Sequence, residues 1–309
     1  MANANGWGDG ASNNNIGWGK GADNAIGWGA IHADSWAGAT DVVGTPAVDP
    51  DAQAFITAAS ITDPTQQSAI NTLVVDLKGY NIWTKMKALY PFVGGTAAQH
   101  KWNLKDPRDL DAAFRLTFHG GGNWDSNGYT PNGTNAYANT YLAPSAQQSL
   151  TSGHFSLYSR TLGASSTVYG GNGVRDQITA LGSQLSLRRG IDSLRYAAMW
   201  DEGTGGIAGG GAETDARGFY LSSRTANNSL KFYKNNSTIA SNTATQTATS
   251  LSIYSYFLGA INQSNVALTD SYDNKQLAFA SIGDGLTDTD VTNLNTRVTT
   301  FQTALNRNV

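Results

Sequence analysis

Short runs in which apolar and polar residues alternate constrain the fold more than any other feature of this chain. Phe219 and Leu221 are separated by Tyr220 and followed by Ser222, and similar runs recur towards the C-terminus. A period of two is typical of strands, and turns rich in Asn, Ser, Thr and Gly separate the runs. The four runs lie at 217–224, 230–239, 251–259 and 276–283. Together they predict an antiparallel sandwich or jelly roll.

Further strands are predicted before this region. Alternating segments lie at 114–118, 154–160 and 195–200, and a glycine-rich loop is expected at 203–211. With the four C-terminal runs, at least seven strands are available from Phe114 onwards, which is enough for two stacked sheets. The sequence therefore predicts a mainly β fold.

Two helices are predicted ahead of the strands. Asp63 and Pro64 are suited to an N-cap and a first helical position, Gln66 occupies the capping-box position, and Gly79 ends the helix. A second helix is expected at 81–90. Its apolar stripe would comprise Ile82, Trp83, Met86, Leu89 and Tyr90. This stripe is expected to be core.

The C-terminus is also predicted to be helical. Thr287 and Asp290 have capping-box spacing, and apolar residues follow at intervals of three and four. These residues are Val291, Leu294, Val298, Phe301 and Leu305. We expect this helix to pack on the sandwich. A seam between three chains is the alternative, although two heptads are fewer than a coiled coil normally needs.

The N-terminal 44 residues contain a repeat in which Gly-Trp-Gly recurs every 10 or 11 residues. Its tryptophans are Trp7, Trp18 and Trp28, and Trp36 ends the series. Flanking glycines disfavour a helix, and each indole can bury roughly 150 to 250 Å². Because the rest of the segment has little apolar surface, it should order only against a partner. The repeat predicts an extended docking arm, joined by a linker at 45–62. A flexible leader is the alternative.

Composition excludes several classes of partner and chemistry. The net charge of −3 offers no basic surface for nucleic acid. The chain has no Cys, so disulfides and thiolate chemistry are absent. The first residues do not resemble a signal peptide and no apolar run reaches transmembrane length, so no membrane partner is expected. Zinc is not expected either, because the four histidines lie in different segments without ligand spacing.

Three C-terminal segments carry a resemblance to a known family. Lys-Phe-Tyr-Lys-Asn-Asn at 231–236 is followed by Tyr-Ser-Tyr-Phe-Leu-Gly-Ala at 254–260 and by Phe-Ala-Ser-Ile-Gly-Asp-Gly-Leu-Thr-Asp-Thr-Asp at 279–290. This order resembles the closing half of concanavalin A-like lectin/glucanase domains. With the Gly-Trp-Gly repeats, the whole chain is similar to virion structural proteins of tailed bacteriophages, such as those infecting Bacteroidota.

The resemblance implies a concanavalin A-like jelly-roll sandwich displayed on a tail, fibre or capsid exterior. We expect a docking arm and linker at 1–62, a helical pair at 63–100, and a lectin-like sandwich with its helix at 101–309, which should fold without the arm. The protein would be made in the host cytoplasm and reside in the virion. Its expected partners are other virion proteins, further copies of itself in the particle, and a host-surface glycan.

One loop region combines the residue types that hold sugars. An aromatic ring packs under the apolar face of a sugar, while amides and carboxylates bond its hydroxyl groups. The candidate glycan-binding residues are His119, Trp124, Asp125, Asn127, Tyr129, Asn132 and Asn135. Alternatively, Trp124 and Tyr129 only close the end of the sandwich. Calcium through Asp125 and Asn127 would have too few ligands, so no cofactor is expected.

Enzymatic activity is not expected. The resembling family includes retaining glucanases, which need two carboxylates about 5 Å apart. The Glu-x-Asp-x-Glu pattern that would present them on a strand is absent, and Glu202, Glu213 and Asp215 lie among glycines instead. Two alternatives to a virion protein stay open: a carbohydrate-active enzyme with a displaced carboxylate pair, and a free lectin.

Overall fold

Two stacked sheets form the body of the computed structural model, which describes residues 48–201 and 206–309. The mainly β fold predicted from the sequence is confirmed. The four repeat tryptophans, which are Trp7, Trp18, Trp28 and Trp36, lie outside the described residues, as does Glu202.

Sheet A has eight strands in the order β13–β12–β11–β6–β17–β4–β3, with β1 paired to β17. All of its pairs are antiparallel. The strands are β1 (Met86–Tyr90), β3 (Asn123–Asp125), β4 (Gly128–Thr130), β6 (Gly153–Ser159), β11 (Gly218–Ala226), β12 (Ser229–Lys234), β13 (Ser237–Asn242) and β17 (Leu277–Gly283).

Sheet B has nine strands in the order β10–β9–β8–β7–β14–β5–β2, with β15 beside β7 and β16 beside β15. β15 pairs with β7 in parallel, and the other pairs are antiparallel. The strands are β2 (Thr117–His119), β5 (Tyr137–Asn139), β7 (Gly171–Arg175), β8 (Leu181–Ser186), β9 (Leu194–Asp201), β10 (Ile207–Ala212), β14 (Phe257–Leu258), β15 (Ile261–Gln263) and β16 (Val266–Ala267).

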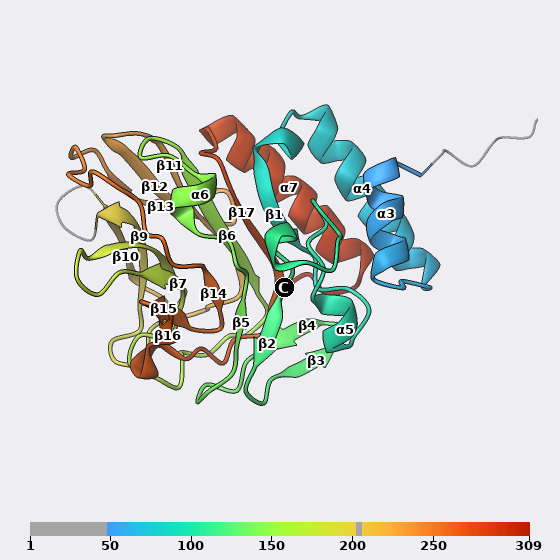
Figure 1. The fold of residues 1–309 in the computed structure, drawn as a ribbon, viewed down its shortest axis with the longest axis horizontal. Coiled ribbons are helices and arrows are strands. Elements are labelled where there is room, and N and C mark those ends of the chain that lie inside the picture. Colours follow the sequence, from blue (N-terminus) through green and yellow to red (C-terminus); the bar gives the residue numbers. More distant parts are fainter. Residues whose placement is uncertain (1–47, 202–205) are drawn as a thin grey trace, which may run out of the picture. The chain divides into compact units, whose positions relative to one another are not determined.

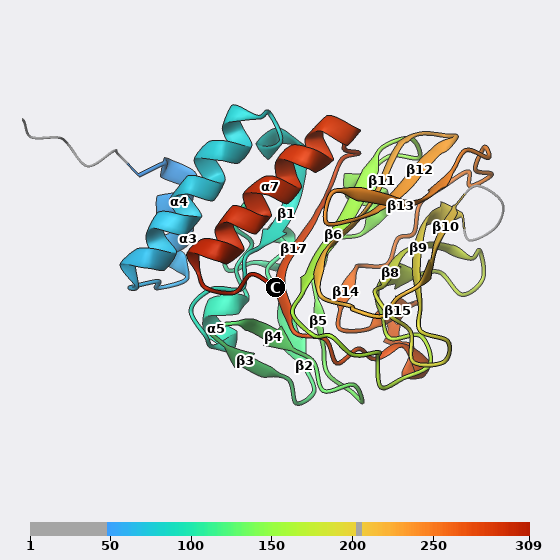
Figure 2. The same ribbon diagram turned by 180° about the vertical axis from the view of Figure 1, so that it is seen from behind.

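Three helices cover the face of sheet A that points away from sheet B (Figures 1 and 2). They are α3 (Pro50–Ala58), α4 (Pro64–Gly79) and α7 (Asp288–Ala304). Short helices complete the described part: α5 (Ala97–His100), α6 (Pro144–Gln147), and the 3-10 turns η2 (Trp83–Lys85), η3 (Asp111–Ala113) and η4 (Thr269–Ser271). None of the helices in this described part is long and apolar enough to cross a bilayer.

Sheet A is buried on both faces, and its strand sequences show why. Along β11, Phe219 and Leu221 belong to the core under the helices, while Tyr220 between them belongs to the core between the sheets. β17 repeats this arrangement, since Phe279 faces the helices and Ala280 faces sheet B. Successive residues of a strand point to opposite faces, so apolar residues at both kinds of position require a cover on each side.

The boundaries predicted for the helix that ends at Gly79, and the predicted start of the C-terminal helix, are confirmed. The Asp63 carboxylate accepts a hydrogen bond from the Thr65 backbone N–H at 2.7 Å, and α4 ends at Gly79. Thr287 and Asp290 form a reciprocal capping box at the start of α7. The predicted packing of this C-terminal helix on the sandwich is also found, since Val291, Leu294 and Val298 join the core beneath sheet A.

Two predictions for the N-terminal half are wrong. The helix expected at 81–90 is a 3-10 turn followed by strand β1, which pairs with β17. Its apolar residues point to both faces of sheet A. Leu89 joins the core under the helices, and Tyr90 joins the core between the sheets. A short, continuously apolar run does not distinguish a buried strand from a buried helix. The linker expected at 45–62 instead contains helix α3, which Asp49 caps.

Strand lengths also differ from expectation. Of the run at 251–259, only Phe257–Leu258 forms a strand. The strand expected at 114–118 is found at Thr117–His119 instead, because Phe114 has a left-handed backbone with φ of 60°. The glycine-rich loop expected at 203–211 includes most of strand β10. The second predicted run, at 230–239, is in fact a hairpin, since Asn235 and Asn236 form a turn between β12 and β13.

The helical segment and the sandwich belong to one unit, Val48–Val309. We therefore expect the fragment 101–309 to fail to fold, because it lacks β1 and α4 and exposes the apolar side of sheet A. The fragment 48–309 should unfold in one cooperative transition. Thermal unfolding followed by circular dichroism, together with limited proteolysis, compares the two. A protease-resistant, cooperatively melting 101–309 fragment would show that the first helices are dispensable.

Candidate functional site

The predicted aromatic platform is part of the core. Tyr129 is fully buried, its ring stacks on Trp124 with centroids 5.8 Å apart, and Phe118 lies 5.2 Å from Trp124 and 4.9 Å from Tyr129. Trp124 itself is half-buried against the core between the sheets. These contacts match the alternative in which both rings close the end of the sandwich, and a fully buried ring offers no face to a sugar.

Asp125 and Asn127 stabilise the hairpin between β3 and β4. The Asp125 carboxylate accepts hydrogen bonds from the Asn127 backbone N–H at 2.7 Å and from the Gln276 amide at 3.1 Å. These bonds tie the hairpin to the start of β17. The described ranges, 48–201 and 206–309, contain no group of three or more His, Asp or Glu residues placed to hold a metal ion.

The remaining predicted residues, His119, Asn132 and Asn135, are exposed. The Asn132 side-chain oxygen accepts bonds from the backbone N–H groups of Asn135 at 3.0 Å and Ala136 at 3.0 Å, so it shapes its own loop. His119 stacks on Tyr137 at 4.7 Å, and Tyr137 stacks on Phe257 at 4.4 Å. The seven predicted residues are thus divided between the core, the β3–β4 hairpin, the exposed end of β2 and an exposed loop.

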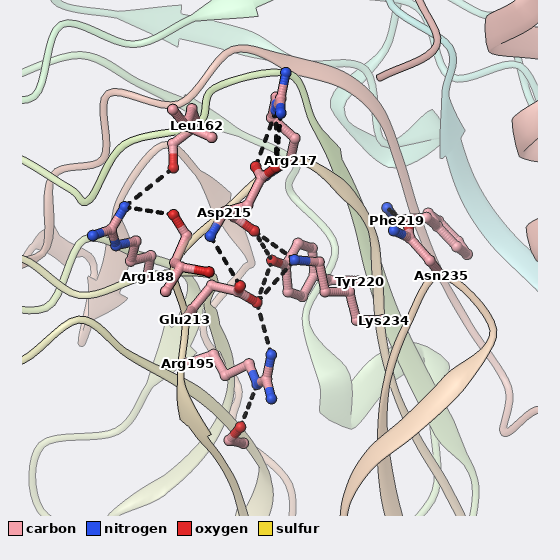
Figure 3. Close-up of polar contacts among 12 residues, drawn as sticks. Leu162, Arg188, Arg195, Glu213, Asp215, Arg217, Phe219, Tyr220, Lys234 and Asn235 are labelled. Atoms are coloured by element: carbon pink, nitrogen blue, oxygen red, sulfur yellow. Dashed lines mark hydrogen bonds and ion pairs between the residues drawn. The ribbon is translucent and has the colours of Figure 1, made fainter.

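The carboxylate of Glu213 lies at the centre of a buried polar cluster (Figure 3). One oxygen accepts from Arg195 at 2.8 Å and Tyr220 at 2.9 Å and lies 3.0 Å from the Lys234 ammonium, while the other accepts from the Asp215 backbone N–H at 3.1 Å. Arg195 comes from sheet B, and Tyr220 and Lys234 come from sheet A. The cluster therefore links the two sheets.

This arrangement does not suit Glu213 to act as a general acid. Burial raises the pKa of Glu213, but bonds from Lys234, Asp215, Arg195 and Tyr220 outweigh burial and lower it overall. Asp215 is engaged by Arg217, whose side-chain bonds lower the Asp215 pKa to about 2. The neighbouring cations Arg195, Lys234 and Arg217 keep both side chains ionised near neutral pH. Neither carboxylate is therefore able to donate a proton to a leaving group at that pH.

A pocket of about 160 Å³ lies on the outer face of sheet B. Leu185 and Ala197 point into the core between the sheets, so their neighbours Gln184, Ser186 and Tyr196 point outward. The lining residues are Tyr169, Arg175, Gln184, Ser186, Arg189, Tyr196, Ile261 and Leu268. We call this the sheet B pocket. It combines aromatic, amide, hydroxyl and guanidinium groups.

Close packing shapes the floor of the sheet B pocket. Gln184 and Ser186 are 6% and 2% exposed, so only small parts of them reach the cavity. A side chain at Gly171 would place its Cβ 2.7 Å from the Ile261 side chain and 3.0 Å from the Ser186 hydroxyl. A larger residue at this position would therefore shift the Ile261 side chain, which forms this wall of the pocket.

A fully buried ion pair fixes the loops that carry the walls. Lys275 and Asp273 lie 3.0 Å apart, and both are 0% exposed. Asp273 accepts a bond from Ser165 at 2.9 Å, which anchors the loop leading to Tyr169. The Lys275 ammonium donates to the backbone carbonyl of Arg188 at 3.3 Å, next to Arg189. The pair thus positions two walls of the sheet B pocket from behind.

Sequence patterns could not reveal this pocket. Its lining comes from three adjacent strands, from β15 and from three loops, and no two aromatic residues in it are near each other in the chain. The available signal was the alternation in β8 and β9, which places polar residues on one face. This alternation indicates which face of the sheet the polar residues occupy, but it does not indicate which loops lie beside them.

A larger groove of about 560 Å³ lies between α4 and α7. Small and apolar side chains, such as Ala69, Leu73 and Ala304, line most of it, and an ion pair of 2.9 Å between Asp76 and Arg297 lies at its edge. It lacks the amide groups and the exposed aromatic rings that recognise sugars.

No protein-family model matches the chain, and no curated protein matches it. Among solved structures, the chain is similar to domain 4 of an extracellular arabinanase from Geobacillus stearothermophilus, solved with arabinotriose. The two are 18% identical over 68% of this chain and 98% of that domain, with a TM-score of 0.45.

Two further solved structures are similar to the chain. The CBM40 domain of a Ruminococcus gnavus sialidase is 12% identical over 48% of this chain and 84% of that domain, with a TM-score of 0.34. The binding domain of botulinum neurotoxin DC, solved with rat synaptotagmin II, is 9% identical over 70% of this chain, with a TM-score of 0.47. This chain spans 52% of the toxin domain.

The Glu213 cluster predicts a specific stability defect. We expect Glu213→Gln to lower the free energy of unfolding near neutral pH by about 2 to 3 kcal/mol, because Arg195 and Lys234 lose their shared counter-charge. This loss of stability is smaller than that for a fully buried pair, because Arg195 and Lys234 are partly exposed to solvent. Urea unfolding measures the change. Asp111→Asn, which removes a surface partner of Arg115, is the control and should have little effect.

The same defect should depend on pH. The folded-state pKa of Glu213 is lower than its ordinary value of 4.5, so its contribution is complete above that value and is lost as the pH falls through the lowered pKa. The difference between wild type and Glu213→Gln should therefore shrink below about pH 4.5. A difference that is constant from neutral pH to about pH 3 would contradict this assignment.

Proposed function

We propose that the described part of the chain is a lectin-like domain that binds a glycan in the sheet B pocket, without catalysis. The observation that carries this proposal is the pairing of Tyr169 and Tyr196 with the polar floor of Gln184 and Ser186 in one outward-facing cavity. Tyrosine rings supply an apolar face for a sugar, and amide and hydroxyl groups bond its hydroxyls.

The position of the pocket supports binding by a preformed site. Gln184 and Ser186 lie on β8, which is paired on both sides by β7 and β9. The Lys275–Asp273 pair anchors the loops next to it. A rigid site loses little conformational entropy when a ligand binds, so a small number of contacts suffices.

We also propose that the chain is a virion structural protein that is held in the particle by its N-terminal repeat. The support is the sequence resemblance to structural proteins of tailed bacteriophages and the regular spacing of the Gly-Trp-Gly units. The tryptophans would bury their indoles against neighbouring virion proteins or further copies of the chain. The lectin-like domain would then be displayed to a host-surface glycan.

Glycan binding should depend on the pocket tyrosines. We expect Tyr169→Ala to weaken binding of the best ligand on a glycan array about tenfold, which corresponds to the loss of one aromatic contact. Tyr80→Ala is a matched control, because Tyr80 is 43% exposed and Tyr169 is 42% exposed. Calorimetry gives the affinities. Equal affinities for both variants and the wild type would remove the sheet B pocket as the binding site.

Incorporation into particles should depend on the repeat. Replacing Trp18 and Trp28 together by alanine should abolish incorporation while the described domain stays folded, since each change removes roughly 3 kcal/mol or more of contact. Counting the protein in purified particles tests this expectation, and circular dichroism checks the fold. Normal incorporation of the double variant would contradict the docking role.

A further inference from the structure

The lining of the sheet B pocket is unusual in its charge. It contains the guanidinium groups of Arg175 and Arg189, and none of the described residues that line it is acidic. Only 14% of the residues in this chain are charged, so two cations around one small cavity stand out. We propose that the pocket selects acidic glycans, which carry a carboxylate or a sulfate. This inference rests on the glycan binding proposed above and names the class of ligand.

Arg189 is held in a defined orientation at the pocket wall. Its guanidinium lies 5.9 Å from the centre of the Tyr196 ring, and Asp192 accepts a bond of 3.1 Å from its Nε and another from its Nη2. The bidentate pair fixes the plane of the group. Nη1 is not used by this pair, and Arg189 remains 21% exposed, so an anion in the pocket can bond to a guanidinium that is already in place.

Asp192 also determines how strongly Arg189 attracts an anion. Its carboxylate offsets much of the charge of Arg189, but it is 33% exposed and is not among the residues that line the cavity. The electrostatic attraction on which this inference depends therefore comes from Arg189, whose charge Asp192 only partly neutralises. A planar guanidinium fork matches the oxygens of a carboxylate or a sulfate better than those of a neutral sugar.

The size of the cavity limits the ligand. At about 160 Å³, it admits a single sugar unit or the acidic substituent of one, with the rest of the chain extending into solvent. Tyr169 and Tyr196 would then contact the ring while the arginines bind the anionic group. A neutral sugar keeps the ring contacts and loses the charge-assisted bonds, which are worth more than bonds between neutral groups.

Matched glycan pairs test the inference on the full chain. The best uronate or sialate ligands of an array are compared with their carboxyl-reduced forms, and the best sulfated ligands with their desulfated forms. We expect the acidic member of at least one pair to bind about 10- to 100-fold more tightly. The advantage should decrease as salt is raised. The glycan pair that shows this advantage identifies the anionic group as a carboxylate or a sulfate.

Two substitutions should act in opposite directions. Arg189→Gln should remove most of the preference for the acidic member, while Asp192→Asn should increase it, because Arg189 is then no longer neutralised. Arg108→Gln is the matched control: Arg108 is 65% exposed and pairs with Asp106 away from the pocket lining, so the preference should be unchanged. Circular dichroism confirms that each variant is folded.

The outcomes separate this inference from the proposed function. If acidic and neutral members bind equally and Tyr169→Ala weakens both, the glycan site stands and the preference for acidic ligands is wrong. If Tyr169→Ala changes neither affinity, the proposed glycan site itself is wrong. An acidic preference that Arg189→Gln and Asp192→Asn leave unchanged would place the anion at another surface and overturn the inference.

Discussion

Sheet A is apolar on both faces, and the rest of the structure depends on this constraint. Phe279 and Ala280 on β17 face opposite ways, and both are fully buried. One face therefore needs the helices and the other needs sheet B, as the layers in Figure 1 show. The central strands of sheet A are covered on both faces, and the sheet B pocket lies on the outer face of the other sheet.

Buried charges then fix how the layers and loops meet. Glu213 joins sheet B to sheet A through Arg195, Lys234 and Tyr220, and Lys275 with Asp273 joins the loops around the pocket. A buried ion pair adds little net stability compared with well-packed apolar residues, but removing one partner is costly. We infer that these groups specify one arrangement of the elements.

Local patterns predicted the elements whose boundaries depend on local physics. Asp63 and Thr287 start helices through caps that involve residues two or three positions away. β1 was assigned wrongly because its surroundings, a helix layer on one side and a sheet on the other, come from distant segments. The packing around the candidate site could not be predicted for a related reason: Trp124 and Tyr129 have the composition of a sugar platform, but Phe118 packs against both rings and Tyr129 is fully buried.

The buried clusters and the sheet B pocket differ in how their charged groups are paired. Glu213 and Asp273 are acidic groups buried with cations already in contact, so all of their strong bonding capacity is used inside the protein. At the sheet B pocket the order is reversed, since Arg189 lines the cavity and its acidic partner Asp192 is not among the residues that line it. A protein that neutralises its interior carboxylates but leaves the Arg189 guanidinium partly exposed at a cavity wall has retained electrostatic attraction where a ligand can use it.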